Sequence, residues 1–247
     1  MRNLALKVEY DGTEFSGFAK QPDVRTVQGV LSEAIGRVVG HKVELIGAGR
    51  TDAGAHAVGQ VVNFYTDHPI PACRLPIAIN KTIARDVFIR KANEVPMEFS
   101  ARFSADTRLY RYTILQRMVR SPFAGRYEMI EKRPLDVQRM NNAALALIGE
   151  HDFSAFTIEP MGSRSFRRVI FGAKVTSASK RIRFEIEGTA FLRGMVRMIT
   201  GALIEIGMGS REEDELSRLL DNDKAVRTTW VVPACGLCLM KVKYSEF

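Results

Sequence analysis

The spacing of apolar residues along the chain predicts its secondary structure before any motif is considered. Leu4, Leu6 and Val8 recur at every second position, which predicts a strand over 3–10. Apolar residues at three- and four-residue spacing predict a helix over 26–39. The next elements are expected as strands at 43–48 and 59–66, a short helix at 71–80 and a strand at 87–93. The order in this half is therefore β-α-β-β-α-β.

The second half repeats this order without obvious sequence identity to the first. Its elements are expected as a strand at 108–117, a helix at 136–149, strands at 167–177 and 180–188, a helix at 191–207 and a strand at 236–243. An additional helix is expected after 210, where Ser210 and Glu213 fit a capping box. The pattern predicts an α+β fold of two ferredoxin-like halves, 1–102 and 103–247, with antiparallel-type sheets.

Composition narrows the class of protein. The 247 residues are 46% hydrophobic, enough for a core, and no apolar run is long enough for a signal peptide or a membrane span. The 3 cysteines do not suggest a disulfide framework. We therefore expect a soluble, cytoplasmic protein that does not enter a membrane.

Positive charge is concentrated in the second half. The formal net charge is +8, and residues 101–247 hold 24 Lys and Arg against 17 Asp and Glu. A polyanionic partner would select such a surface, although a merely basic soluble protein fits the charge alone equally well. The residues expected to contact a polyanion are Arg164, Arg167, Arg168, Lys180, Arg181 and Arg183.

The stretch GAGRTDAGAH, residues 47–56, holds a single carboxylate, Asp52, among glycines and alanines, two residues after Arg50. Small residues allow a tight turn and close approach of another molecule. Asp52 is therefore either a turn aspartate that caps its own backbone or a functional carboxylate that a ligand must reach.

The sequence gives little support for a dinucleotide, phosphate-loop, serine-hydrolase or metal site. Asp52 occupies the sixth place of a G-x-G-x-x-G fingerprint, and the residues that follow predict a strand, so a dinucleotide site is disfavoured. No Gly-Lys-Ser/Thr or Gly-x-Ser-x-Gly is present. Cys235 and Cys238 form a lone C-x-x-C at the start of the last strand without further metal ligands nearby, which favours buried strand cysteines and no metal.

Further candidates come from the second half. Tyr110 and Tyr112 alternate on an expected strand, and Arg193 and Arg197 are four apart on the expected 191–207 helix, which would place them on one face. Each has an ordinary structural explanation, namely half-buried strand aromatics and a solvated helix charge. The apolar neighbours of Arg197 make its full solvation doubtful.

Several blocks of the sequence together resemble the TruA family of tRNA pseudouridine synthases. They are YDGTEFSGFAKQ, VQGVL, GAGRTDAGAHAVGQVVNF, ARFSADTRLYRYTI, GEHDFSAF and FLRGMVRMITGALIEIG, in the order of the family and spanning essentially the whole chain. Two blocks depart from the family pattern. Gly17-Phe18-Ala19 stands where Gly-Trp-Gln is usual, and VVPACG replaces a small Lys-containing segment.

The resemblance implies two ferredoxin-like halves with joined sheets and a basic cleft between them. It implies that Asp52 is the catalytic aspartate, Tyr110 the active-site tyrosine and Arg197 the arginine that pairs with the aspartate. Arg50 would help to displace the target base, and Arg193 is a candidate for substrate binding. The implied protein is a cytoplasmic homodimer that acts without a cofactor or metal on uridines 38 to 40 of the tRNA anticodon stem-loop. The competing hypothesis is a non-catalytic RNA-binding or folding module on the same scaffold.

Overall fold

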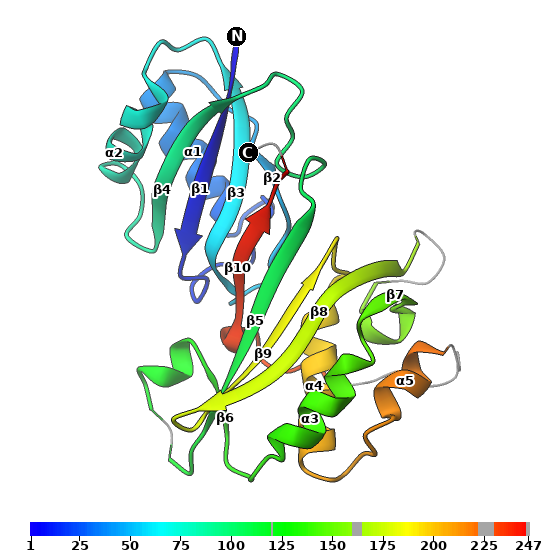
Figure 1. Cartoon of the computed structure of the whole chain (residues 1–247). Coiled ribbons are helices and arrows are strands. Elements are labelled where there is room, and N and C mark those ends of the chain that lie inside the picture. The colour runs from blue at the N-terminus through cyan, green and yellow to red at the C-terminus, as the bar shows by residue number, and fades with distance from the viewer. Residues whose placement is uncertain (120, 160–164, 222–229, 246–247) are drawn as a thin grey trace. The chain divides into compact units, whose positions relative to one another are not determined.

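The structure is a computed structural model that describes residues 1–119, 121–159, 165–221 and 230–245. The chain divides into two compact units (Figure 1). Unit 1 comprises Met1–Asp106 and Cys238–Phe247, and unit 2 comprises Thr107–Leu237. Both units combine a sheet with helices, so the predicted α+β class is confirmed.

Unit 1 is built on an antiparallel sheet in which β1 lies between β4 and β3. The strands are β1 (Arg2–Tyr10), β2 (Ile46–Gly47), β3 (His56–Thr66), β4 (Val87–Val95) and β10 (Leu237–Lys243). β2 adds to β3 antiparallel, and β10 pairs in parallel with the first residues of β3. Leu4, Leu6 and Val8 of β1 are fully buried, as the alternating pattern predicted.

The helices of unit 1 lie on one face of this sheet (Figure 1). α1 (Val27–Val39) begins where the Thr26 side chain accepts a hydrogen bond from the Gly29 N–H, and it ends at Gly40 in the left-handed conformation. The stripe that includes Leu31 and Ile35 is buried. The predicted 71–80 helix consists of a 3₁₀ turn, η1 (Ala72–Arg74), and α2 (Leu75–Asn80).

In unit 2 the strands pair antiparallel in the order β5-β9-β8-β7, with β6 parallel to β5. The strands are β5 (Thr107–Gln116), β6 (Met129–Glu131), β7 (Gly149–Asp152), β8 (Arg167–Ala178) and β9 (Arg181–Gly188). The helices are α3 (Val137–Leu145), α4 (Met195–Gly207) and α5 (Glu215–Leu220), and the 3₁₀ turns are η2 (Ala124–Arg126), η3 (Ser154–Phe156) and η4 (Ala234–Gly236). α3 packs against both β8 and α4.

Several element boundaries differ from the sequence prediction. The predicted 43–48 strand is reduced to the two residues of β2, and α3 ends at Leu145 rather than at 149. The prediction that Ser210 caps the following helix is wrong, because the Ser210 hydroxyl donates to the Glu205 carbonyl at the end of α4. α5 begins after Asp214 instead.

The domain boundary predicted at 102/103 stays a prediction, as do the ferredoxin-like halves, the joined sheets and the cleft between them. No helix in the described residues is long and apolar enough to cross a membrane. Over the same residues, no group of three or more His, Cys, Asp and Glu side chains is placed to hold a metal ion.

Candidate functional site

Asp52 lies on the loop between β2 and β3, in a backbone that is fixed on both sides. The Ala55 N–H donates to the Asp52 carbonyl at 3.1 Å, which closes a four-residue turn with Gly54 at φ 78°. Before it, the Thr51 carbonyl accepts from the Phe18 N–H at 3.1 Å, and the Thr51 hydroxyl is 2.8 Å from that of Tyr10. The Asp52 side chain stays partly exposed on this fixed backbone.

A second set of contacts ties the end of this loop to the turn that follows β1. The Gly12 N–H donates to Nδ1 of the buried His56 at 3.0 Å. Asp11 Oδ1 is 3.3 Å from the same nitrogen, but a nitrogen that accepts a hydrogen bond carries no proton, so the neutral imidazole fits this geometry. A Cβ at Gly12 would lie 1.8 Å from the Ala55 carbonyl oxygen, so only glycine allows the turn to come this close.

The packing gives a structural reason for two small residues of the motif. A Cβ at Gly47 would lie 2.4 Å from Cε1 of the buried Phe18 ring, and Gly54 has the left-handed conformation of its turn. Neither residue needs an external ligand to explain it. The sequence interpretation that the small residues admit another molecule is therefore replaced by close packing at Gly47 and by the turn conformation at Gly54.

Arg50 is the other functional candidate of the loop. Its side chain is exposed, and the Gly49 carbonyl that precedes it accepts from the buried Gln60 side chain at 3.0 Å. The loop thus presents one carboxylate and one guanidinium from a backbone held by hydrogen bonds. Such a carboxylate suits nucleophilic or acid–base chemistry on a ligand that approaches from solvent.

The tyrosines lie on β5 of unit 2. Tyr110 is buried and packs edge-to-face on Phe191, with ring centroids 5.0 Å apart. Tyr112 is fully buried, and its hydroxyl donates to the Pro233 carbonyl at 2.6 Å. Burial raises the pKa of Tyr112. Tyr112 therefore has a structural role, whereas the hydroxyl group of Tyr110 is the candidate for chemistry.

The arginine pair is not arranged as the sequence predicted. α4 begins at Met195, and Gly194 before it takes the left-handed conformation at φ 75°. Arg193 therefore precedes the helix, and the prediction that Arg193 and Arg197 share one helix face is wrong. The Arg193 side chain is exposed, and its carbonyl accepts from the Thr157 hydroxyl. Arg197 is half-buried, and its Nε donates to the Val232 carbonyl at 2.7 Å, so it is not a solvated helix charge.

The basic side chains of unit 2 that were predicted to contact a polyanion differ in their ion pairing and exposure. Arg167 pairs with Glu150, Arg181 pairs with Glu128, and burial lowers the pKa of Arg168. Lys180 and Arg183 are exposed. Arg164 lies outside the described residues. Lys180 and Arg183 therefore keep the most accessible charge of this set.

The cysteines of the C-x-x-C are not buried strand residues as the sequence predicted. Cys235 lies on η4 and Cys238 on β10, and both are partly exposed. Burial, the largest influence on the Cys235 thiol, raises its pKa, which argues against a reactive thiolate.

The structure thus groups Asp52 and Arg50 on one loop of unit 1, and Tyr110, Arg193 and Arg197 in unit 2. Sequence reasoning missed the residues that hold the Asp52 loop, chiefly Tyr10, Gly12 and His56. The only sequence signal for them was their membership of the two blocks YDGTEFSGF and GRTDAGAH, which the fold brings together.

Comparison with known proteins gives a consistent result. The model of the tRNA pseudouridine synthase family matches residues 6–104 and 143–245, which include Asp52 and Arg197. The chain is 42% identical to tRNA pseudouridine synthase A of Citrifermentans bemidjiense, over 100% of this chain and 99% of that protein. The protein of the same name from Geobacter sp. strain M21 is 41% identical over 100% of both chains. That of Acetivibrio thermocellus is 39% identical over 99% of this chain and 100% of its own.

These matches span the α+β units and the loop that carries Asp52, and they define an RNA-modifying isomerase. The chain belongs to the tRNA pseudouridine synthase family. It is therefore an enzyme that acts in tRNA pseudouridylation, with tRNA as its substrate.

Proposed function

We propose that this protein isomerises uridine to pseudouridine at positions 38 to 40 of the tRNA anticodon stem-loop, with Asp52 as the nucleophile. The observation that carries the proposal is the Asp52 loop, whose carboxylate is partly exposed while its backbone is held at Thr51 and Ala55. A fixed backbone lowers the cost of orienting a nucleophile at the moment of reaction.

The reaction needs no redox step or group donor. It breaks the bond between N1 and C1′, turns the base, and joins C5 to C1′. A carboxylate suits this sequence because it can attack and later leave, as in retaining glycosidases. Attack at C1′ and attack at C6 are both compatible with a carboxylate in this position.

The other residues have separate roles in the proposal. The target base must leave its stack, at a cost of a few kcal/mol. The exposed Arg50 side chain stacks in the vacated space, since a planar guanidinium covers a base face. Tyr110 stacks on the extruded uracil, and its hydroxyl relays the proton from C5, giving up its own proton as it accepts that one, so that N1 ends protonated. Arg197 supplies the positive charge that keeps the carboxylate ionised under a covering base, and Arg193 contributes a phosphate contact from its exposed position.

We further propose that the enzyme works in the cytoplasm as a homodimer, without a membrane partner or cofactor. These points rest on the family resemblance and on the composition of the chain, and they enter none of the chemical steps above.

The decisive experiment is the replacement of Asp52. We expect Asp52→Asn and Asp52→Ala to abolish pseudouridine formation in transcribed tRNA while tRNA binding and thermal unfolding stay close to wild type. Asp23→Asn is the matched control, because Asp23 is an exposed turn aspartate of the same unit whose positive φ asparagine tolerates. Measurable turnover by Asp52→Ala would exclude Asp52 as the nucleophile.

The same assay separates the enzyme from a non-catalytic RNA-binding module. An RNA-binding module would bind tRNA without forming pseudouridine even in the wild-type protein. Mapping the modified positions in tRNA from cells that lack this protein would identify which of the three uridines it modifies.

A further inference from the structure

A surface groove in unit 2 combines aromatic and basic side chains outside the candidate catalytic residues. It has a volume of about 720 Å³ and is lined by residues of 115–117 and 121–128 and by the turn between β8 and β9. We call it the aromatic–basic groove, and the lining residues used below are Arg117, Phe123, Tyr127, Glu128, Lys180 and Arg181.

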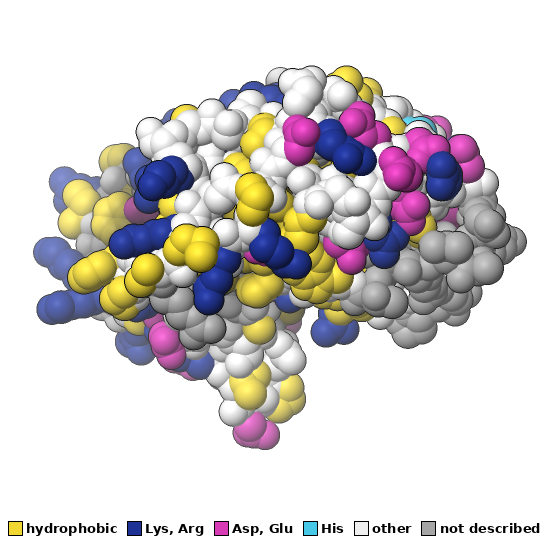
Figure 2. All heavy atoms as spheres, turned by 90° about the horizontal axis from the view of Figure 1, so that it is seen from below, with side chains coloured by type: hydrophobic (Ala, Val, Ile, Leu, Met, Phe, Trp, Pro, Cys, Tyr) yellow, Lys and Arg dark blue, Asp and Glu magenta, His cyan; other side chains and the backbone are white. Residues whose placement is uncertain are grey.

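The aromatic residues of the groove are unusually exposed. The Phe123 side chain is 86% exposed, and Tyr127 is also exposed on the same short segment. Met118 and Val119 next to Arg117 are exposed as well. Figure 2 shows hydrophobic side chains interspersed with Lys and Arg side chains toward its left side, with few carboxylates among them. Clustered exposed apolar residues of this kind mark an interaction surface.

The opposite wall of the groove is a tight turn that holds a lysine outward. Ser179 and Lys180 both have positive φ, 49° and 65°, a conformation that residues other than glycine rarely adopt twice in succession. The Lys180 carbonyl accepts from the Gln116 N–H at 2.8 Å, which fastens the turn to the end of β5. Lys180 is therefore presented from a fixed backbone.

Charge indicates what the groove binds. Its one acidic lining residue, Glu128, already pairs with Arg181 at 2.6 Å, which leaves Arg117 and Lys180 as exposed cations. A second copy of the chain that docked by this face would set these cations against their own counterparts. A phosphate backbone would neutralise them, and unpaired bases would stack on the exposed rings.

We propose that the aromatic–basic groove binds an unpaired segment of the tRNA substrate, with bases against Phe123 and Tyr127 and phosphates at Arg117 and Lys180. The inference rests on the proposed function only in taking tRNA as the partner. It adds a contact that anchors the RNA away from the reacting uridine, so it affects affinity and leaves the chemical step unchanged.

The test measures tRNA binding by the full chain, with Phe123→Ala/Tyr127→Ala as one variant and Arg117→Gln/Lys180→Gln as another. We expect the aromatic variant to weaken binding at least about fivefold. We expect the charge variant to reduce the slope of log affinity against log salt by about one for each lost phosphate contact. The controls are Phe103→Ala, since Phe103 is 79% exposed in unit 1, and Lys42→Gln, an exposed lysine of unit 1.

Sedimentation velocity and single-turnover rates at saturating tRNA accompany the binding assay. Weaker binding by both groove variants, with unchanged sedimentation and rate, supports the proposal. Binding equal to that of the controls overturns it. A change of association state in the groove variants also overturns it, because the face then belongs to a second copy. If the wild type forms no pseudouridine but the groove variants still bind tRNA more weakly, the proposed function fails and the groove assignment stands.

Discussion

Replacement of Arg197 by methionine separates a structural role of this side chain from a catalytic one. Arg197 lies near the start of α4, and its Nε donates to the Val232 carbonyl at 2.7 Å. Val232 is fully buried, so no solvent replaces the lost donor. Methionine keeps an unbranched apolar side chain on the helix but cannot donate a hydrogen bond.

The structure sets the size of the expected effect on stability. A buried carbonyl that loses its donor costs about 1–3 kcal/mol. A solvated helix charge would change the free energy of unfolding by no more than about 0.5 kcal/mol. We therefore expect Arg197→Met to lower the free energy of unfolding by about 1–3 kcal/mol. Arg197→Lys should recover part of this loss, since lysine keeps a donor and the charge but lacks the planar fork of the guanidinium.

Chemical denaturation measures this change, with Arg193→Met as the control. Arg193 is exposed and precedes the helix, so its replacement should stay within about 0.5 kcal/mol of wild type. If Arg197→Met and the control have the same free energy of unfolding, the hydrogen bond to Val232 contributes nothing measurable to stability, and a structural role of Arg197 is refuted.

The catalytic role has its own measurement, single-turnover rate against pH for wild type, Arg197→Lys and Arg197→Met. In the proposed mechanism, loss of the Arg197 charge makes the Asp52 carboxylate harder to ionise, so the acidic limb of the profile should move to higher pH. The pH of the acidic limb should rise in the order wild type, Arg197→Lys, Arg197→Met. Coincident acidic limbs at similar rates would show that Arg197 does not act on the nucleophile.

Two further predictions follow from local packing and charge. Gly47→Ala should destabilise the protein by about 1–3 kcal/mol, because its Cβ would lie 2.4 Å from the Phe18 ring. Denaturation of the Gly47→Ala/Phe18→Leu double variant tests the cause. If the smaller leucine side chain does not relieve the loss of stability, the clash with the ring is not responsible for it. Burial opposes ionisation of Glu185, but hydrogen bonds from Arg111 and Lys174 outweigh it and lower its pKa. The stability that Glu185 contributes is therefore present above its unfolded-state pKa and is lost as the pH falls through the lower folded value. Glu185→Gln should lower the free energy of unfolding at neutral pH, and a difference that persists unchanged in acid would refute this.

The regular elements could be predicted from the sequence because their signals are local. The alternation of Leu4, Leu6 and Val8 predicted β1, and the apolar spacing over 26–39 predicted α1 with little error at its ends. The motif around Asp52 singled out this carboxylate without any structure, since its place among small residues is a property of the sequence itself, and the family resemblance then made it the candidate nucleophile.

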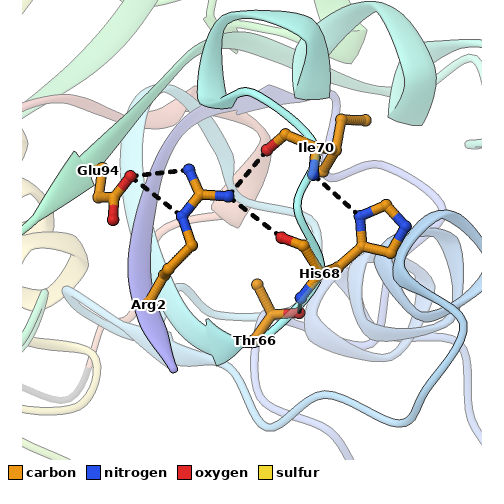
Figure 3. Close-up of polar contacts among 5 residues, drawn as sticks. All are labelled: Arg2, Thr66, His68, Ile70 and Glu94. Atoms are coloured by element: carbon orange, nitrogen blue, oxygen red, sulfur yellow. Dashed lines mark hydrogen bonds and ion pairs between the residues drawn. The ribbon is translucent and has the colours of Figure 1, made fainter.

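Boundaries and partners depended on contacts between distant residues. The 191–207 pattern could not show that Gly194 adopts a left-handed conformation, which starts α4 at Met195 and separates Arg193 from it. Arg2 is a similar case, as Figure 3 shows. Its guanidinium donates to Glu94 and to the carbonyls of His68 and Ile70, residues more than sixty positions away in the chain.

The sequence by itself determined the candidate residues for the chemistry, because residue type and motif are written in it. Only the tertiary structure decided how the Asp52 loop is held, because Tyr10 at the end of β1 and Gly12 and Phe18 in the segment after it contact the loop from a distant part of the chain. Periodicity reports which side of an element is apolar, and it contains no information about which distant backbone fills the space beside it. The same limit applied to Arg197, whose bond to Val232 arises from the fold and not from the helix pattern.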